Sequence, residues 1–259
     1  MPEAGPEVGP EERLLKKYGA RPIADLPEAV GKFHLKVVTD VLAGHDNGGG
    51  AVGVLRATQV WHAHHEGLAG SRPRELNFGG TAKRLACAAG CNHCCRSPVG
   101  VVAAEAVLIA HYVDRTFSAP AWAGLARRMA ERALALQGDP LGTHLCPLNV
   151  DGKCLVYEVR PYNCRVFHSF DVKACERVFL QGEPQGGLPI DPVRRRFDKL
   201  ITASATVAFT AIKLDMRMIE FMAALELALA AGERRVERLA GGEDLFASLP
   251  TVAPPSSAE

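Results

Sequence analysis

The sequence predicts a mainly α-helical fold, in which helices flank an irregular cysteine-rich insert with a small hairpin. Apolar residues recur at helical spacing before residue 66 and after residue 192, and no series of alternating strand patterns separates them. All eight cysteines lie between Cys87 and Cys175, in a stretch rich in turn-forming residues. We therefore expect residues 11–248 to form a single helical domain that contains the cysteine-cluster region 85–175.

The chain before the cysteines is expected to be helical after a disordered start. Residues 1–10 are acidic and rich in Pro and Gly, so they lack the apolar content that ordering requires. Apolar spacing predicts a short helical turn at Glu11–Tyr18 and longer helices at Glu28–Leu42 and Val52–His65. The glycine-rich run Gly44–Gly50 is expected to break the helical pattern, and residues 67–80 to form a loop.

Two helices and a hairpin are expected after the first cysteines. The helices are predicted at Val101–Val113 and at Ala119–Gln137, the second beginning after an N-cap at Ser118. Residues 145–149 and 153–157 are predicted to pair over a turn at Asp151–Gly152. The remaining residues before Pro192 are expected to be irregular.

Asp191 and Pro192 predict a strong helix start, because an N-cap is followed by a proline whose missing N–H is not needed there. The helical pattern continues to Ala231, as one long helix or as two helices with a bend, and a short helix is expected at Glu233–Leu239. Residues 249–259 are rich in Pro and Ser and are expected to be a disordered tail.

Composition excludes little and favours an ordinary globular protein. The chain has 259 residues, of which 47% are hydrophobic and 23% charged, and its net charge is +1. A nearly balanced charge predicts no general affinity for nucleic acid or for anionic membranes. No secretory signal and no apolar run of membrane-spanning length is apparent, so we expect a cytoplasmic protein. In a reducing compartment, clustered thiols bind metals more often than they form disulfides.

The spacing of the cysteines indicates a metal site. One group comprises Cys87, Cys91, Cys94 and Cys95, and a second comprises Cys146, Cys154, Cys164 and Cys175. Thiolates are soft ligands that select zinc, iron or copper(I), and a Cys-x-x-Cys turn presents two sulfurs to one ion. A structural zinc uses four ligands, so this number of thiols fits two ions, an iron–sulfur cluster with spare thiols, or one site beside redox-active cysteines.

These residues resemble a known family. The run Cys87-x-x-x-Cys91-x-x-Cys94-Cys95 precedes Cys146-Pro-Leu, Gly-Lys-Cys154 and Arg-Pro-x-x-Cys164-Arg, and this order is similar to the YkgJ-type CxxCxxCC family. The likeness covers residues 85–170, although the first gap is three residues where many members have two. The resemblance implies chelation of zinc or iron through the following seven thiols: Cys87, Cys91, Cys94, Cys95, Cys146, Cys154 and Cys164. Cys175 lies outside the shared motif and ranks last as a ligand.

Two enzyme readings are also considered. Flagellin lysine N-methylases carry a similar cysteine cluster, which implies that some relatives use an iron-dependent or iron–sulfur centre to modify proteins. The spacing of Cys87, Cys91 and Cys94 also matches radical S-adenosylmethionine enzymes. Those enzymes place an aromatic residue before the third cysteine, where this chain has His93, and they begin a strand–helix series that this sequence does not predict.

Histidines and arginines add weaker signals. His62 and His65 would share a helix face beside His64, at a spacing suited to a metal, although a polar helix end also explains them. His93 and His168 adjoin the cysteine motifs and either could complete a coordination shell. Two arginines, Arg160 and Arg165, bracket Cys164, where they would offset thiolate charge or hold the insert through backbone carbonyls.

Three functional hypotheses follow. The protein could hold or pass on zinc or iron, use an iron–sulfur centre as an enzyme, or carry a closed structural zinc site that stiffens a helical interaction domain. The expected partner is a metal ion, with no membrane or nucleic acid, and a protein partner or substrate is left open. In each case, the two cysteine groups are predicted to converge in space.

Overall fold

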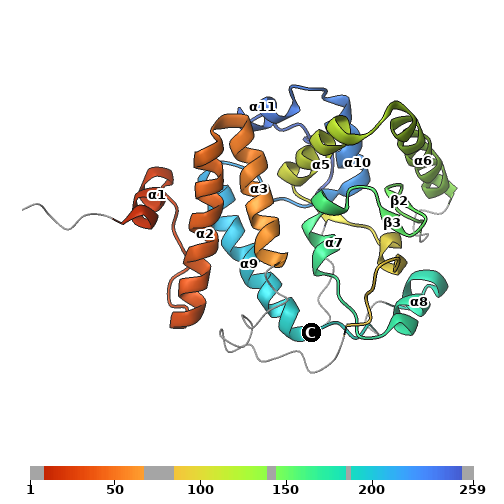
Figure 1. Cartoon of the computed structure of the whole chain (residues 1–259), viewed down its shortest axis with the longest axis horizontal. Helices are drawn as coiled ribbons and strands as arrows, with labels where there is room; N and C mark the ends of the chain where they lie inside the picture. The colour runs from red at the N-terminus through yellow and green to blue at the C-terminus, as the bar shows by residue number, and fades with distance from the viewer. Residues whose placement is uncertain (1–8, 67–84, 139–143, 185–187, 253–259) are drawn as a thin grey trace, which may run out of the picture.

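The structure, a computed structural model, describes residues 9–66, 85–138, 144–184 and 188–252, and it is mainly helical as the sequence predicts. Figure 1 shows α2, α3 and α9 packed together on one side of the molecule. Helices α6 and α8 and the β2–β3 hairpin lie on the other side, with α5 and α7 between them. The expected flanking helices are therefore present, and the cysteine region lies beside them.

Three helices come first: α1 (Pro10–Tyr18), α2 (Glu28–Gly48) and α3 (Gly50–Glu66). The predicted break does fall within Gly44–Gly50, but it is narrower than expected, because α2 continues through most of this run and only Gly49 separates the two helices. The glycines allow close packing instead. A Cβ at Gly53 would lie 2.4 Å from the carbonyl oxygen of His45, so α3 can cross α2 there only without a side chain.

The next part of the chain supplies a 3-10 helix, one short strand and two further α-helices. The elements are the 3-10 helix η2 (His93–Arg96), β1 (Gly100–Val101), α5 (Ala103–Thr116) and α6 (Ala119–Gly138). Strand β1 pairs antiparallel with β4 (Ile219–Glu220), which joins the segment before α5 to the C-terminal helices. Helix α5 begins two residues later than predicted, because Val101 belongs to β1.

The predicted hairpin is present in a shorter form, followed by helices that were not predicted. The elements are β2 (Asn149–Val150), β3 (Lys153–Cys154), the 3-10 helix η3 (Tyr157–Val159), α7 (Tyr162–Val166) and α8 (Val172–Gln181). The expectation of irregular structure up to Pro192 is wrong for α8. Its Asp171 side chain caps the backbone N–H groups of Lys173 and Ala174, and Gly182 ends it in the left-handed conformation.

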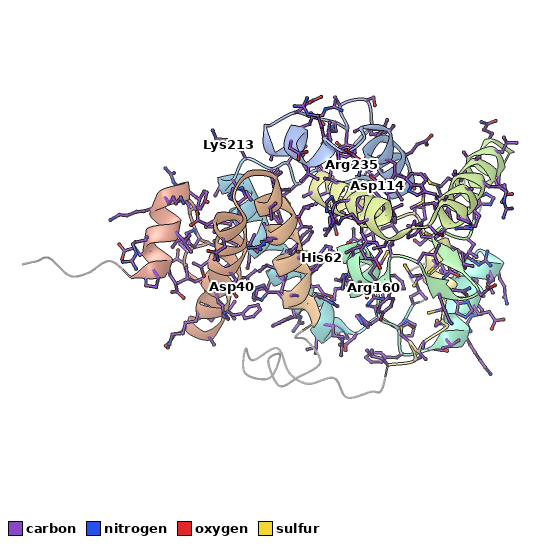
Figure 2. All side chains as sticks on the ribbon, turned by 45° about the horizontal axis from the view of Figure 1, so that its top comes forward. Asp40, His62, Asp114, Arg160, Lys213 and Arg235 are labelled. Atoms are coloured by element: carbon purple, nitrogen blue, oxygen red, sulfur yellow. The ribbon has the colours of Figure 1, made fainter. Side chains whose placement is uncertain are left out.

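The C-terminal part begins at the predicted cap. Asp191 accepts hydrogen bonds from the backbone of Val193 and Arg194 at the start of α9 (Pro192–Ala211). Of the two predicted alternatives, the structure has two helices. Lys213 adopts a left-handed φ of 61°, and β4 lies between α9 and α10 (Phe221–Ala230). The short α11 (Arg235–Ala240) completes the helices, and its buried Arg235 forms an ion pair with Asp114 of α5, whose side chain is partly exposed; Figure 2 labels both residues.

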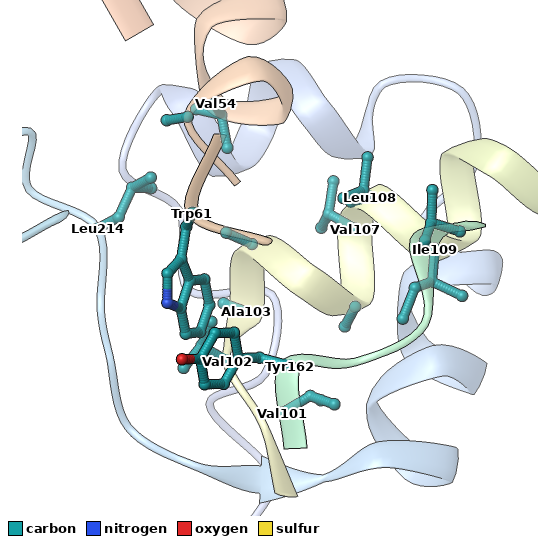
Figure 3. Close-up of a cluster of buried hydrophobic side chains, with 14 of the residues drawn as sticks. Val54, Trp61, Val101, Val102, Ala103, Val107, Leu108, Ile109, Tyr162 and Leu214 are labelled. Atoms are coloured by element: carbon teal, nitrogen blue, oxygen red, sulfur yellow. The ribbon is translucent and has the colours of Figure 1, made fainter. Parts of the chain in front are cut away.

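The main core lies where α2, α3, α5, α9 and α10 meet. Figure 3 shows one part of it, in which the Trp61 ring of α3 stacks on the Tyr162 ring of α7 at 4.7 Å. A second, smaller cluster comprises five buried residues of α8 and the following loop: Ala174, Cys175, Val178, Phe179 and Leu188. Helix and loop residues of the cysteine region therefore have little apolar core of their own.

The predicted tails fall mostly outside the described residues. Residues 1–8, the predicted loop at 67–80 and residues 253–259 are outside them, while Pro10 already belongs to α1 and Thr251 bridges to Ile219. Within the described part of the chain, no helix is both long enough and apolar enough to cross a membrane.

Candidate metal centre

The first cysteine group lies on a loop that ends in a 3-10 helix. The loop turns at Gly90, whose φ is 85°, and the backbone N–H of Cys91 donates to the carbonyl of Ala88 at 3.0 Å. Helix η2 then carries Cys94 and Cys95 on successive positions. A 3-10 helix has three residues per turn, so neighbouring side chains leave it in different directions.

The hairpin brings part of the second cysteine group against this loop. Asp151 and Gly152 both have positive φ values, 51° and 77°, which is the turn that two-residue hairpins favour. A Cβ at Gly152 would lie 3.2 Å from the carbonyl oxygen of Gly90, so the hairpin turn contacts the first loop through backbone alone. On β3, Cys154 lies opposite Asn149 of β2.

Direct hydrogen bonds join the two groups. The backbone N–H of Cys146 donates to the carbonyl of Cys95 at 2.8 Å. The side-chain amide of Asn149, 54 positions further along the chain than Cys95, lies 3.5 Å from the Cys95 Sγ. The predicted convergence of the two cysteine groups is therefore confirmed for these segments, although the chain between them contains α5 and α6.

The last motif cysteine is held by α7. Cys164 lies in the first turn of this helix, and its backbone N–H donates to the carbonyl of Pro161 at 3.0 Å. Arg165 is buried and donates to the carbonyls of Arg160 and Glu158 at 3.0 and 2.6 Å. Both roles considered for Arg165 are present: its bonds to backbone carbonyls fix the turn before Cys164, and its positive charge partly opposes the burial that raises the pKa of Cys154.

Arg160 has a different position. Its guanidinium lies 4.1 Å from the centre of the exposed Tyr157 ring, and its Nε is buried without a hydrogen bond among the described residues. Burial raises the pKa of Cys154, and the hydrogen bond from Cys94 lowers that of Cys95; the positive charge of Arg160 acts in the lowering direction on both thiols. In Figure 2, sulfur atoms gather to the right of Arg160, on the side away from Asp40. The positive charge of Arg160 therefore favours the thiolate forms of Cys95 and Cys154.

Burial keeps most of these thiols protonated at neutral pH. Burial raises the pKa of Cys146 to about 12 and also raises the pKa values of Cys154 and Cys164. The Cys94 thiol donates a hydrogen bond to Cys95, which raises the pKa of Cys94 and lowers that of Cys95. Such thiols become thiolates only when a cation compensates their charge, and a coordinated metal ion provides that compensation.

Cys87 and Cys175 are associated with Ser169 and α8. The backbone N–H of Ser169 lies 3.4 Å from the Cys87 Sγ, and the backbone N–H of Ala86 donates to the carbonyl of Ser169 at 2.9 Å. Helix α8, which carries Cys175, packs against η2, and Cys94 contacts the small apolar cluster around Cys175. The sequence did not predict that Cys175 lies near the first cysteine group, because it did not predict α8.

The histidines are mostly engaged elsewhere. His62, His64 and His65 lie within 2.9, 3.1 and 3.2 Å of the carboxylates of Glu105, Asp40 and Asp198, respectively. The reading of this group as a polar helix end is wrong for His62 and His65, which are buried against carboxylates of other helices. His168 stacks on His65 at 5.7 Å, so its ring is engaged with α3. The buried Nδ1 of His93 has no hydrogen bond within the described residues.

Convergence of the cysteines does not extend to a formed coordination shell. All eight thiols are free, and among the described residues no group of three His, Cys, Asp or Glu side chains is arranged to hold a metal ion. The chemistry of the donors does fit zinc or iron, since soft sulfurs converge beside arginines and the buried Oδ1 of Asn149 has no hydrogen-bond partner in the described part of the chain. Metal binding would require the thiols to lose protons and draw together.

Comparisons with known proteins do not assign the chain to a class. No protein-family model matches the sequence, and no curated protein or solved structure matches it either. The fold bears on the radical S-adenosylmethionine reading, because the four described strands form two antiparallel pairs and no parallel strand–helix series. That reading is therefore not carried further.

Proposed function

We propose that this protein binds zinc or iron through its cysteine region, as a metal-binding protein of the YkgJ-type kind. The supporting observation is the hydrogen bond between the backbones of Cys95 and Cys146, which joins two thiol groups from distant parts of the chain. Cys87 and Cys91 lie on the loop that leads into η2, which carries Cys94 and Cys95. Cys154 lies on the hairpin, and Cys164 lies on α7. These thiols are the proposed ligands.

The surroundings of the thiols support the same proposal. Burial raises the pKa values of the Cys146 and Cys164 thiols, so these two are poor nucleophiles at neutral pH without an activating cation. Arg160 partly offsets negative charge at Cys95 and Cys154, as is needed where several thiolates gather around one or more cations. Backbone hydrogen bonds and glycine contacts place the segments that carry the sulfurs.

The test is the metal content of the protein. The full chain, purified without oxygen, is analysed for zinc, iron and acid-labile sulfide, and its visible absorption is recorded. We expect at least about one equivalent of zinc or iron per chain, colourless for zinc and brown for an iron–sulfur cluster. Cys154→Ser should lower the content, whereas the control Val156→Thr, two residues away, should not.

The contrary result is equally clear. Wild-type protein that holds neither zinc nor iron after anaerobic purification, and takes up neither when supplied with it, would contradict the proposal. Alkylation gives a second readout, because coordinated thiols react slowly and should become reactive when a chelator is added.

A further inference from the structure

The amide side chain of Asn149 lies where the two cysteine groups meet. Its Nδ2 atom is 3.5 Å from the Cys95 Sγ, and the residue is only 6% exposed. We propose, resting on metal binding by this region, that Asn149 is a positioning residue whose N–H···S hydrogen bond holds the Cys95 sulfur in place for coordination. A bond of this kind orients a metal-binding sulfur and withdraws electron density from it.

The backbone of Asn149 is fixed by two other cysteines. Its N–H donates to the carbonyl of Cys146 at 2.8 Å, and on β2 it lies opposite Cys154 of β3. The next contact along the hairpin runs from the N–H of Leu155 to the carbonyl of Leu148, also at 2.8 Å. With its backbone held on both sides and its side chain buried, the amide has little freedom to leave the Cys95 sulfur.

Packing alone does not account for an amide at this position. A buried amide costs free energy unless both of its ends form hydrogen bonds, and the Oδ1 of Asn149 has no partner among the residues that the structure describes. Leucine has the same branching without this cost. The N–H end of the amide does make a contact, and its partner is a sulfur. The chemical reason for the amide therefore lies in its contact with Cys95.

Other thiols of the region accept similar bonds from the backbone. The N–H of Ser169 lies 3.4 Å from the Cys87 Sγ. Burial raises the pKa of Cys146 to about 12, and a hydrogen bond from the backbone N–H of Leu148 acts in the lowering direction. A thiol sulfur is a weak acceptor and an ionised sulfur a stronger one, so N–H donors aimed at sulfur suit coordinated cysteines. Cys95 differs because one of its donors is a side chain, which a substitution can remove.

The first measurement detects the hydrogen bond in the metal-free protein. Nuclear magnetic resonance of the isotope-labelled full chain, kept reduced, identifies the side-chain amide signal of Asn149 by its absence in Asn149→Leu. Cys95→Ala should shift this signal and make its protons exchange with water about tenfold faster, because a hydrogen bond is lost. Asn163 is the internal control. Its side-chain amide donates to the carbonyl of Gly100 at 2.7 Å, so its signal should not respond.

The second measurement examines the coordinated sulfur. The full chain is loaded anaerobically with cobalt(II), whose thiolate charge-transfer absorption moves to lower energy when the sulfur becomes a stronger electron donor. Asn149→Leu should keep the wild-type cobalt content, because Asn149 is not a ligand, and should shift this absorption to longer wavelength. The matched control Asn163→Leu removes an amide that bonds a carbonyl, and should leave the absorption unchanged.

The outcomes separate this inference from the proposed function. If the Asn149 amide does not respond to Cys95→Ala, or if cobalt-loaded Asn149→Leu absorbs as the wild type does, Asn149 only packs in the hairpin and the inference is wrong. Loss of bound cobalt from Asn149→Leu, with helical circular dichroism retained, would also contradict it, because removing a positioning residue leaves the ligands in place. A wild type that binds no cobalt, zinc or iron overturns the proposed function itself.

Discussion

The helical frame and the cysteine region are held together by different means. In the frame of α2, α3, α5, α9 and α10, dozens of buried apolar side chains form one continuous core. In the cysteine region, the apolar cluster around Cys175 has five buried members, and from residues 144–184 only Leu148, Val156, Val159 and Tyr162 are buried members of the main core. Apolar burial offsets ordering entropy in the frame, so we expect the cysteine region to need another source of stability.

Metal binding is the source that we propose, since coordination free energy becomes folding free energy for the segment that supplies the ligands. The comparison then predicts that the two regions respond differently to the same perturbation. Removing metal should loosen η2, the hairpin, α7 and α8, and should leave the frame folded.

The largest expected effect comes from Cys164→Ser. Cys164 is a partly buried residue in the first turn of α7. Its replacement should lower metal content and make residues 144–184 sensitive to protease, while most helical circular dichroism remains. Limited proteolysis with mass mapping checks this, with Val156→Thr as control. Cleavage spread equally over α2 and α9 would show that the two regions do not separate.

The next effect concerns the side chain that links the regions. The buried carboxylate of Glu105 accepts hydrogen bonds from His62 Nε2 at 2.9 Å and from the backbone N–H groups of Val102 and Tyr162 at 3.1 and 2.5 Å. Glu105→Gln replaces one acceptor by a donor, so we expect a loss of about 1–3 kcal/mol in the free energy of unfolding. Denaturant titration measures it, with the exposed Glu131→Gln as control.

A result within about 0.5 kcal/mol of the wild type would contradict this role for Glu105. Because Tyr162 begins α7, the same variant should also loosen the cysteine region, which the protease assay can report.

The frame can be perturbed alone at the crossing of α2 and α3. A methyl group at Gly53 would overlap the His45 carbonyl, so Gly53→Ala should destabilise the protein by about 1–3 kcal/mol without changing metal content in the folded state. At Gly124 of α6, a Cβ would meet only the end of the Arg128 side chain, and Gly124→Ala should stabilise by about 0.5–1 kcal/mol. Thermal unfolding compares the two, and equal shifts would refute close packing at Gly53.

The smallest effect is a pH dependence at the joint between α3 and the cysteine region. Burial lowers the pKa of His168 from 6.5 to about 4. Below pH 6.5 the unfolded chain binds a proton that the folded chain does not, so this contribution to stability is complete above pH 6.5 and falls as pH approaches 4. We expect a change of about 1 kcal/mol after screening of the partly exposed ring.

His168→Gln should flatten the stability profile between pH 6.5 and 4. Burial raises the pKa of the neighbouring Asp198, which acts in the opposite direction at the acidic end of this range. Urea unfolding at a series of pH values measures both, and an unchanged slope in the variant would assign the dependence to other groups.

Local signals in the sequence predicted the parts of this comparison that depend on neighbouring residues. The hairpin turn at Asp151–Gly152 and the cap at Asp191 follow from residue type, and the clustering of cysteines predicted the approach of Cys95 to Cys146. Helix α8 was missed, although Asp171 and Gly182 are suitable caps for it. The helix was not predicted because the residues around it are polar and rich in turn formers, which favoured irregular structure.

Contacts between distant helices could not be predicted. The carboxylate partners of His62 and His65 belong to α5 and α9, and the residues near these histidines in the sequence do not indicate which carboxylates they contact. The glycines near the α2–α3 crossing predicted a loop, because glycine weakens an isolated helix. In the structure they permit the two helices to approach closely. The contact of Ser169 with Cys87 and Cys175 depends on the path of the chain around η2.

Amide hydrogen exchange, resolved by region and compared before and after chelation, tests the central claim most directly. We predict that the metal-loaded protein protects the backbone N–H groups of Cys95 and Cys146 and those of α8. After chelation these amides should exchange quickly, while the amides of α2, α3 and α9 keep their protection. Identical exchange in both regions with and without chelator would contradict the claim that bound metal orders the cysteine region.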